Sequence, residues 1–160
     1  MVPAVSRDPC KHRVVASDPI DANDTNDPES AYELLQRGTA LLADRHHAQA
    51  AVVLERAARL EPGKGSILEA LGRATYNSGQ HQRAAETFTA LLEVDPSSAY
   101  GHFALGQSLR KLGRIPEART HLRLAVALSP ASELYQGALA RLPEDTPPKD
   151  TPPKDTQPPA

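Results

Sequence analysis

Residues 65–98 read GSILEALGRATYNSGQHQRAAETFTALLEVDPSS, and this stretch decides the fold. Its apolar residues recur every three or four positions on both sides of the Asn-Ser-Gly-Gln segment at 77–80. That spacing places side chains on one face of an α-helix. A glycine in such a segment can take the left-handed conformation that ends a helix. The stretch therefore predicts two short helices joined by a tight turn.

The same pattern occurs three times at an interval of 34 residues. The proline that closes each unit disfavours helix at the residue before it, and the small residues inside each unit allow its two helices to approach closely. A single hairpin cannot bury its apolar face, so the units are expected to stack. The residues that keep the interval are Pro62, Pro96 and Pro130; Gly38, Gly72 and Gly106; and Ala50, Ala84 and Ala118.

These intervals predict an all-α fold, an αα-hairpin solenoid over residues 30–142, with units at 31–64, 65–98 and 99–130. A capping helix at 131–142 is expected to cover the open end of the third hairpin, with Leu134, Ala138 and Leu142 on one face and Ser129 or Ser132 at its start. The turn of the first unit, at 43–46, lacks glycine and is expected to be less sharp than the other two.

The pattern resembles the tetratricopeptide repeat (TPR) family. The family signature places Leu-Gly in the first helix of each unit, an alanine and an aromatic residue in the second, and a proline after it. The chain departs from this signature with Leu34, Leu68 and His102, where the family usually has a large aromatic residue. The matching residues include Leu71-Gly72, Leu105-Gly106, Phe88, Ala57, Ala125 and the alanines and prolines named above.

The two ends of the chain differ from this middle part in composition. Residues 1–29 are rich in Asp, Asn, Pro and Ser, and residues 143–160 contain TPPKD twice in tandem. Both ends are acidic, whereas the middle carries a small excess of positive charge. Segments with so few apolar residues cannot bury enough surface to offset the entropy of ordering them. We expect an acidic disordered head and a disordered, proline-rich tail.

The resemblance implies a concave groove lined by the first helix of each unit, in which a peptide or partner protein binds. Aromatic anchors beside Arg and Asn suit a peptide, because they offer apolar contact together with hydrogen bonds. For some of the aromatic residues, ordinary packing is the alternative. The groove residues so implied are Tyr32, Leu35, Thr39, Glu69, Arg73, Tyr76, Asn77, Tyr100, Phe103, Gln107, Arg110 and Lys111.

The third unit is also rich in arginine and lysine. This basic character allows two interpretations: a docking site for an acidic segment, either of a partner or of the chain's own head, or simply a solvated face. Arg119 and Arg123 are expected to share one face because they are four residues apart. The residues concerned are Arg110, Lys111, Arg114, Arg119 and Arg123.

Composition argues against several classes of function. The formal net charge of −2 does not favour a nucleic-acid or membrane-surface partner. One cysteine excludes a disulfide scaffold, and no stretch approaches the roughly 18 apolar residues of a membrane span. The six histidines are explained by packing or exposure, and no catalytic or phosphate-binding motif is found. We expect a cytoplasmic, non-enzymatic protein without a cofactor or metal.

Three functions remain open. The first is a protein–protein interaction module that acts as a scaffold or adaptor. The second is a small chaperone dedicated to one or two client proteins. The third is a self-associating structural subunit, in which the first helix pairs two protomers through Tyr32, Leu35 and Leu42.

Overall fold

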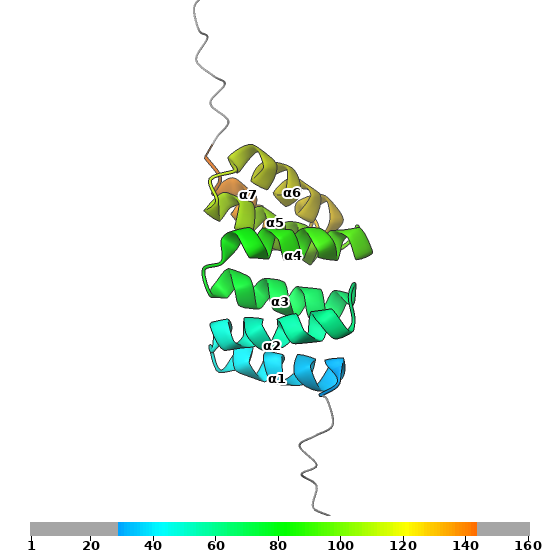
Figure 1. Cartoon of the computed structure of the whole chain (residues 1–160). Coiled ribbons are helices and arrows are strands. Elements are labelled where there is room, and N and C mark those ends of the chain that lie inside the picture. The colour runs from blue at the N-terminus through cyan, green and yellow to red at the C-terminus, as the bar shows by residue number, and fades with distance from the viewer. Residues whose placement is uncertain (1–28, 144–160) are drawn as a thin grey trace, which may run out of the picture.

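The structure, a computed structural model, describes residues 29–143. The predicted head and tail therefore lie almost entirely outside the described residues. Within them the chain forms helices and no strands, which confirms the predicted all-α fold (Figure 1). The helices are α1 (Ala31–Ala43), α2 (His47–Leu60), α3 (Gly65–Asn77), α4 (His81–Val94), α5 (Ala99–Lys111), α6 (Ile115–Leu128) and α7 (Glu133–Ala140).

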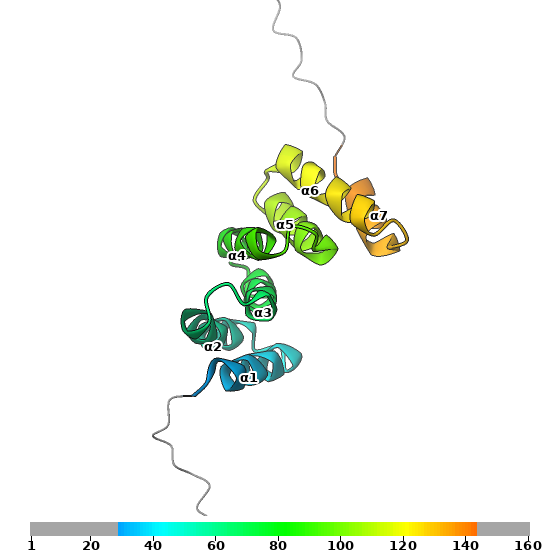
Figure 2. The same ribbon diagram turned by 90° about the vertical axis from the view of Figure 1, so that its right-hand side faces the viewer.

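The helices pair into hairpins that stack in sequence order. Turned by 90°, the array shows α1, α3, α5 and α7 along one side and α2, α4 and α6 along the opposite side (Figure 2). The interval of 34 residues appears in the starts of the helices: Ala31, Gly65 and Ala99 begin the first helix of each hairpin, and Glu133 begins α7. Helix α7 is therefore the shortened first helix of a fourth unit.

The last helix differs from its prediction in two respects. It spans Glu133–Ala140, shorter than the expected 131–142, because the Ser132 side chain caps it by accepting from the backbone N–H of Tyr135. Ala138 and Leu142 are buried as expected, but Leu134 is 60% exposed. Leu134 points away because the buried face of α7 follows the register of the preceding first helices, in which Ala70 and Ala104 correspond to Ala138.

Each hairpin is held by a glycine pressed against a large core side chain of the opposite helix. A Cβ atom added to Gly72 would lie 2.5 Å from Cε1 of Phe88, and one added to Gly38 would lie 2.5 Å from Cγ of Leu54. In the third hairpin Gly106 has the same relation to Leu122. These three partners are 0 to 1% exposed, so the small residues fix how closely the helices approach.

The turns inside the hairpins are more alike than the sequence predicts. Gly79 and Gly113 adopt φ values of 83° and 77°, and Arg45 adopts the same left-handed conformation with φ 62°. The backbone N–H of the next residue then donates to a carbonyl five residues earlier: His46 to Leu41 at 2.8 Å, and Gln80 to Thr75 at 2.9 Å. The first turn is thus as sharp as the others, and the expectation of a looser turn is wrong.

The close approach at Gly72 gives a first prediction. Gly72→Ala should lower the free energy of unfolding by about 1–3 kcal/mol, because its methyl group overlaps the buried ring of Phe88. Gly137→Ala in α7 is the matched control, since its Cβ would meet only the Arg141 side chain, at 3.7 Å. Urea denaturation of both variants measures the effect. Equal stability of Gly72→Ala and the wild type would mean that the hairpin tolerates a wider spacing.

The left-handed residue of the first turn gives a second prediction. Arg45→Gly should raise the free energy of unfolding by about 1 kcal/mol, because a left-handed conformation costs roughly 1–2 kcal/mol for a residue with a Cβ atom. Gly79→Ala should lower the free energy of unfolding. Backbone strain alone causes this loss, because no atom lies within 4 Å of the added Cβ. Thermal unfolding of the two variants tests both signs.

Candidate functional site

The described part of the chain has a hollow between α3 and α5, on the side that the first helices of the hairpins line. Its volume is about 260 Å³. We call this hollow the groove; it is lined by Arg73, Tyr76, Asn77, Phe88, Tyr100, Phe103, Ala104, Gln107 and Arg110. The 34-residue register brings α3 and α5 side by side, so residues far apart in sequence share the site.

Aromatic rings in mutual contact form the floor of the groove. Phe88 of α4 meets Tyr100 edge-on, with ring centroids 6.3 Å apart and planes at 80°. Tyr100 lies 6.3 Å from Phe103, and Phe103 lies 4.9 Å from Tyr135 of α7. Such tilted and edge-to-face pairs stabilise one another. The floor thus runs from α4 across α5 to α7, and a side chain entering the groove would meet ring faces and edges.

Two members of this row were not among the predicted site residues. Phe88 was identified only as part of the repeat signature, yet its ring lines the groove. Tyr135 was assigned only to a capping helix, yet it extends the floor. The repeat interval could have revealed Tyr135, because it places the start of a fourth first helix at Glu133.

The hydroxyl of Tyr100 remains protonated at neutral pH. Burial raises the pKa of Tyr100 to about 12; Glu69 and Tyr135 act in the same direction, and Arg73 opposes them. Among the described residues, no hydrogen bond involves this hydroxyl. Tyr100 can therefore donate an O–H to a bound group in a partly desolvated setting.

Polar groups surround the aromatic floor. The Nε of Arg110 donates to Oε1 of Gln107 at 2.9 Å, which holds the guanidinium about two helical turns from Phe103 on α5. Arg73 and Asn77 are exposed on α3. A ring of hydrogen-bonding groups around an apolar floor is the composition of a binding pocket rather than of a packed core.

The structure brings together only part of the predicted site. Glu69 lies on α3 close enough to act on Tyr100, and Lys111 is exposed next to Arg110. The residues of α1 lie outside the groove: Tyr32 is 67% exposed, Leu35 packs on the first hairpin's core, and the Thr39 hydroxyl donates to the Leu35 carbonyl. The predicted residues that line the groove are Arg73, Tyr76, Asn77, Tyr100, Phe103, Gln107 and Arg110.

The basic residues of the third hairpin do not form one continuous surface. Arg110 lies in the groove, whereas Arg114 pairs with Glu117, its Nε donating to Oε1 at 2.7 Å. Arg119 donates to the carbonyl of Pro143 and is half-buried, whereas Arg123 is exposed. The structure therefore does not contain a single docking site built from all five residues.

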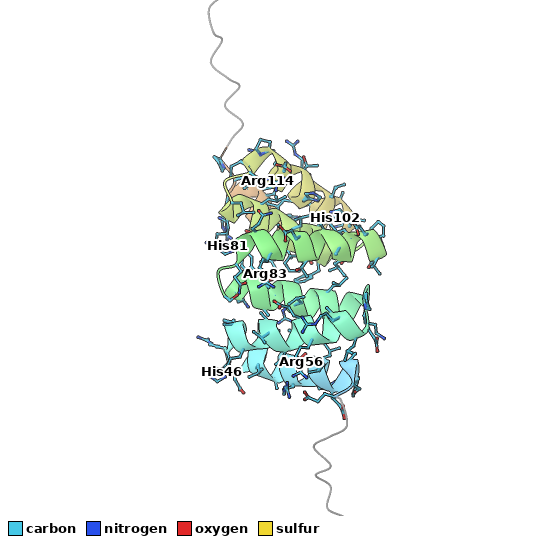
Figure 3. The ribbon with its side chains drawn as sticks, viewed as in Figure 1. His46, Arg56, His81, Arg83, His102 and Arg114 are labelled. Atoms are coloured by element: carbon cyan, nitrogen blue, oxygen red, sulfur yellow. The ribbon has the colours of Figure 1, made fainter. Side chains whose placement is uncertain are left out.

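A pair of histidines joins α5 to α6 away from the groove. Nδ1 of His102 lies 3.0 Å from Nδ1 of His121, and Nε2 of His102 lies 3.2 Å from the Pro96 carbonyl. His102 is labelled in Figure 3. The carbonyl requires a donor, so His102 carries its proton on Nε2 and accepts at Nδ1 from His121. Burial lowers the pKa of His121, with His102 acting in the same direction and Glu117 opposing.

Residues 29–143 contain no cluster of three or more His, Cys, Asp or Glu side chains able to hold a metal ion. None of the helices in this range is long and apolar enough to cross a membrane.

Helical hairpins stacked in register, with a hollow between their first helices, define an open helical-repeat protein. Comparison identifies the family: the model of the tetratricopeptide repeat matches residues 69–133. The chain is a tetratricopeptide-repeat protein. Its fold is that of a protein–protein interaction module, a class that is generally non-catalytic.

Similar proteins agree with this assignment. Superkiller complex protein 3 of Mus musculus is 32% identical over 110 residues, which are 69% of this chain but only 7% of that protein. Among solved structures, YrrB, described as a TPR protein with an unusual peptide-binding site, has a TM-score of 0.67 at 23% identity over 69% of this chain and 57% of its own. The first TPR of Spaghetti (RPAP3), bound to the HSP90 peptide SRMEEVD, has a TM-score of 0.68 at 14% identity over 72% and 92%. At these identities the two structures establish the fold alone.

The histidine pair gives a third prediction. Because the pKa of His121 is lowered in the folded chain, the unfolded chain binds more protons below the ordinary value of about 6.5. The free energy of unfolding should therefore be highest above that pH and fall as the pH drops below it. His121→Gln should reduce this dependence, as measured by urea denaturation between neutral and mildly acidic pH. Identical pH profiles for the variant and the wild type would contradict the role given to the lowered pKa of His121.

Proposed function

We propose that this chain is a non-enzymatic adaptor that holds a peptide-like segment of a partner protein in the groove. The observation that carries the proposal is the row of half-buried rings at Tyr100, Phe103 and Tyr135 beneath polar side chains. Fully buried rings would be core, and isolated exposed rings would be ordinary surface. Rings that are partly covered and contiguous leave apolar area for an incoming side chain.

Two similarities support the proposal. YrrB is described as having a peptide-binding site, and the RPAP3 domain was solved with a peptide bound. The partial relative, Superkiller complex protein 3, is by name a component of a complex. The descriptions of YrrB and of the RPAP3 domain connect this fold with peptide binding, and we extend that role to this chain.

The proposal gives a fourth prediction. The full-length protein should enrich peptides from a random library displayed on phage. The Phe103→Ala variant should bind the enriched peptides at least about tenfold more weakly than the wild type, as expected when a buried anchor is removed. Val52→Ala is the control, because Val52 is 61% exposed on α2, outside the groove. Circular dichroism and melting confirm that both variants fold. Peptides that bind both variants equally would show that another surface is used.

The dedicated chaperone and the self-associating subunit remain the alternatives. A chaperone would suppress aggregation of a purified client at equal molar ratio, whereas an adaptor would bind partners that are already folded. Self-association through α1, where Tyr32 is exposed, would make the mass in sedimentation depend on concentration. A mass that stays monomeric across concentrations excludes that alternative.

A further inference from the structure

The chemistry of the groove narrows the kind of segment that it can hold, an inference that rests on the proposed function. Elsewhere on the array, several basic side chains pair with carboxylates of the same chain. Figure 3 shows Arg56, Arg83 and Arg114 spread along the array of hairpins. The ion pairs of the described residues include Arg37–Glu29, Arg56–Glu29, Lys64–Glu61, Arg83–Glu55 and Arg114–Glu117.

Among the described residues, exposed arginines without an ion pair also occur outside the groove, as at Arg123, but the groove places such arginines beside aromatic rings. Within residues 29–143, neither Arg73 nor Arg110 forms an ion pair. Arg110 is half-buried, and its one hydrogen bond uses Nε and the neutral amide oxygen of Gln107. Both Nη groups of Arg110 therefore have donors to offer, in the planar geometry that matches a carboxylate.

The nearest opposing charge does not neutralise this site. Glu69 precedes Arg73 by one helical turn on α3 but makes no ion pair with it in the described part of the chain. Its influence falls on Tyr100, whose pKa it helps to raise. Lys111 adds a further positive charge beside Arg110. The groove therefore carries an excess of positive charge, greatest at the end of α5.

The hollow itself is small. A volume of about 260 Å³ lies just below the range of roughly 300–1,000 Å³ that holds a drug-sized ligand. It is suited to a side chain or two from a longer segment, and its aromatic floor favours an apolar or aromatic one.

We propose that the groove selects a segment of a partner protein in which an apolar or aromatic side chain is flanked by Asp or Glu. The apolar side chain lies on the rings of Tyr100 and Phe103, and the flanking carboxylates accept from Arg73 and Arg110. Charge complementarity of this kind gives specificity and faster association. The carboxylates are those of side chains within the segment, so the ligand does not have to end in the groove.

Peptides blocked at both ends test this proposal with the full-length chain. Each peptide has a central Phe, and its flanking residues are all acidic, all amide (Asn and Gln) or all basic. The wild type should bind the acidic peptide at least about tenfold more tightly than the amide peptide, the loss expected for one charge-assisted hydrogen bond. The basic peptide should bind more weakly still. Fluorescence polarisation at several salt concentrations provides the affinities.

Two variants with the same net charge separate local recognition from general attraction. Arg110→Gln should reduce the preference for the acidic peptide to within about twofold, whereas Arg123→Gln, on the exposed face of α6, should leave it intact. Equal affinity for acidic and amide peptides in the wild type would overturn the proposal. So would a preference that persists in Arg110→Gln or disappears in Arg123→Gln.

The phage-display selection tests the proposed function independently of the acidic specificity. If selected peptides depend on Phe103 but carry no acidic residues, the groove binds peptides and the acidic specificity is wrong. If no selected peptide depends on Phe103, both proposals fail.

Discussion

The contact between Gly72 and Phe88 connects the fold to the candidate site. Because glycine has no side chain, α3 and α4 approach closely enough to bury the Phe88 ring, which is 1% exposed. The same ring packs edge-on with Tyr100 of the next hairpin, with ring centroids 6.3 Å apart. The same contact therefore closes one hairpin, joins it to the next and provides the base of the groove. A repeat protein has only neighbour contacts to rely on, so one such position has an unusually large effect.

The ion pairs within the chain also bear on the candidate site. On the second helices and in the turns, glutamates form ion pairs with arginines of the same chain. On the first helices, the side chains that point into the groove are aromatic, amide or arginine, and the one nearby acid, Glu69, leaves Arg73 and Arg110 without an ion pair in the described part of the chain. The groove thus combines half-buried rings with arginines that make no ion pair in the described part of the chain. These two properties arise from different residues, and their coincidence in one place is what makes the groove a candidate site.

The sequence predicted the helical hairpins well because glycine, alanine and proline at an interval of 34 residues report steric requirements that few other residues meet. It failed where a conformation is imposed by the neighbouring structure. Arg45 adopts a left-handed conformation that its residue type disfavours, because the close pairing of α1 and α2 demands it. Tyr135 joins the groove floor through its contact with Phe103, because which first helices face one hollow depends on the packing of hairpins.

The most direct test of the account is the location of a bound segment on the folded chain. Amide chemical shifts of the full-length protein can be followed by nuclear magnetic resonance during titration with a peptide selected by the protein. We expect the perturbed amides to cluster on α3, α5 and α7, around Arg73, Phe103 and Tyr135. Perturbations confined to α2, α4 and α6 would contradict this location, because binding would then use a surface away from the groove.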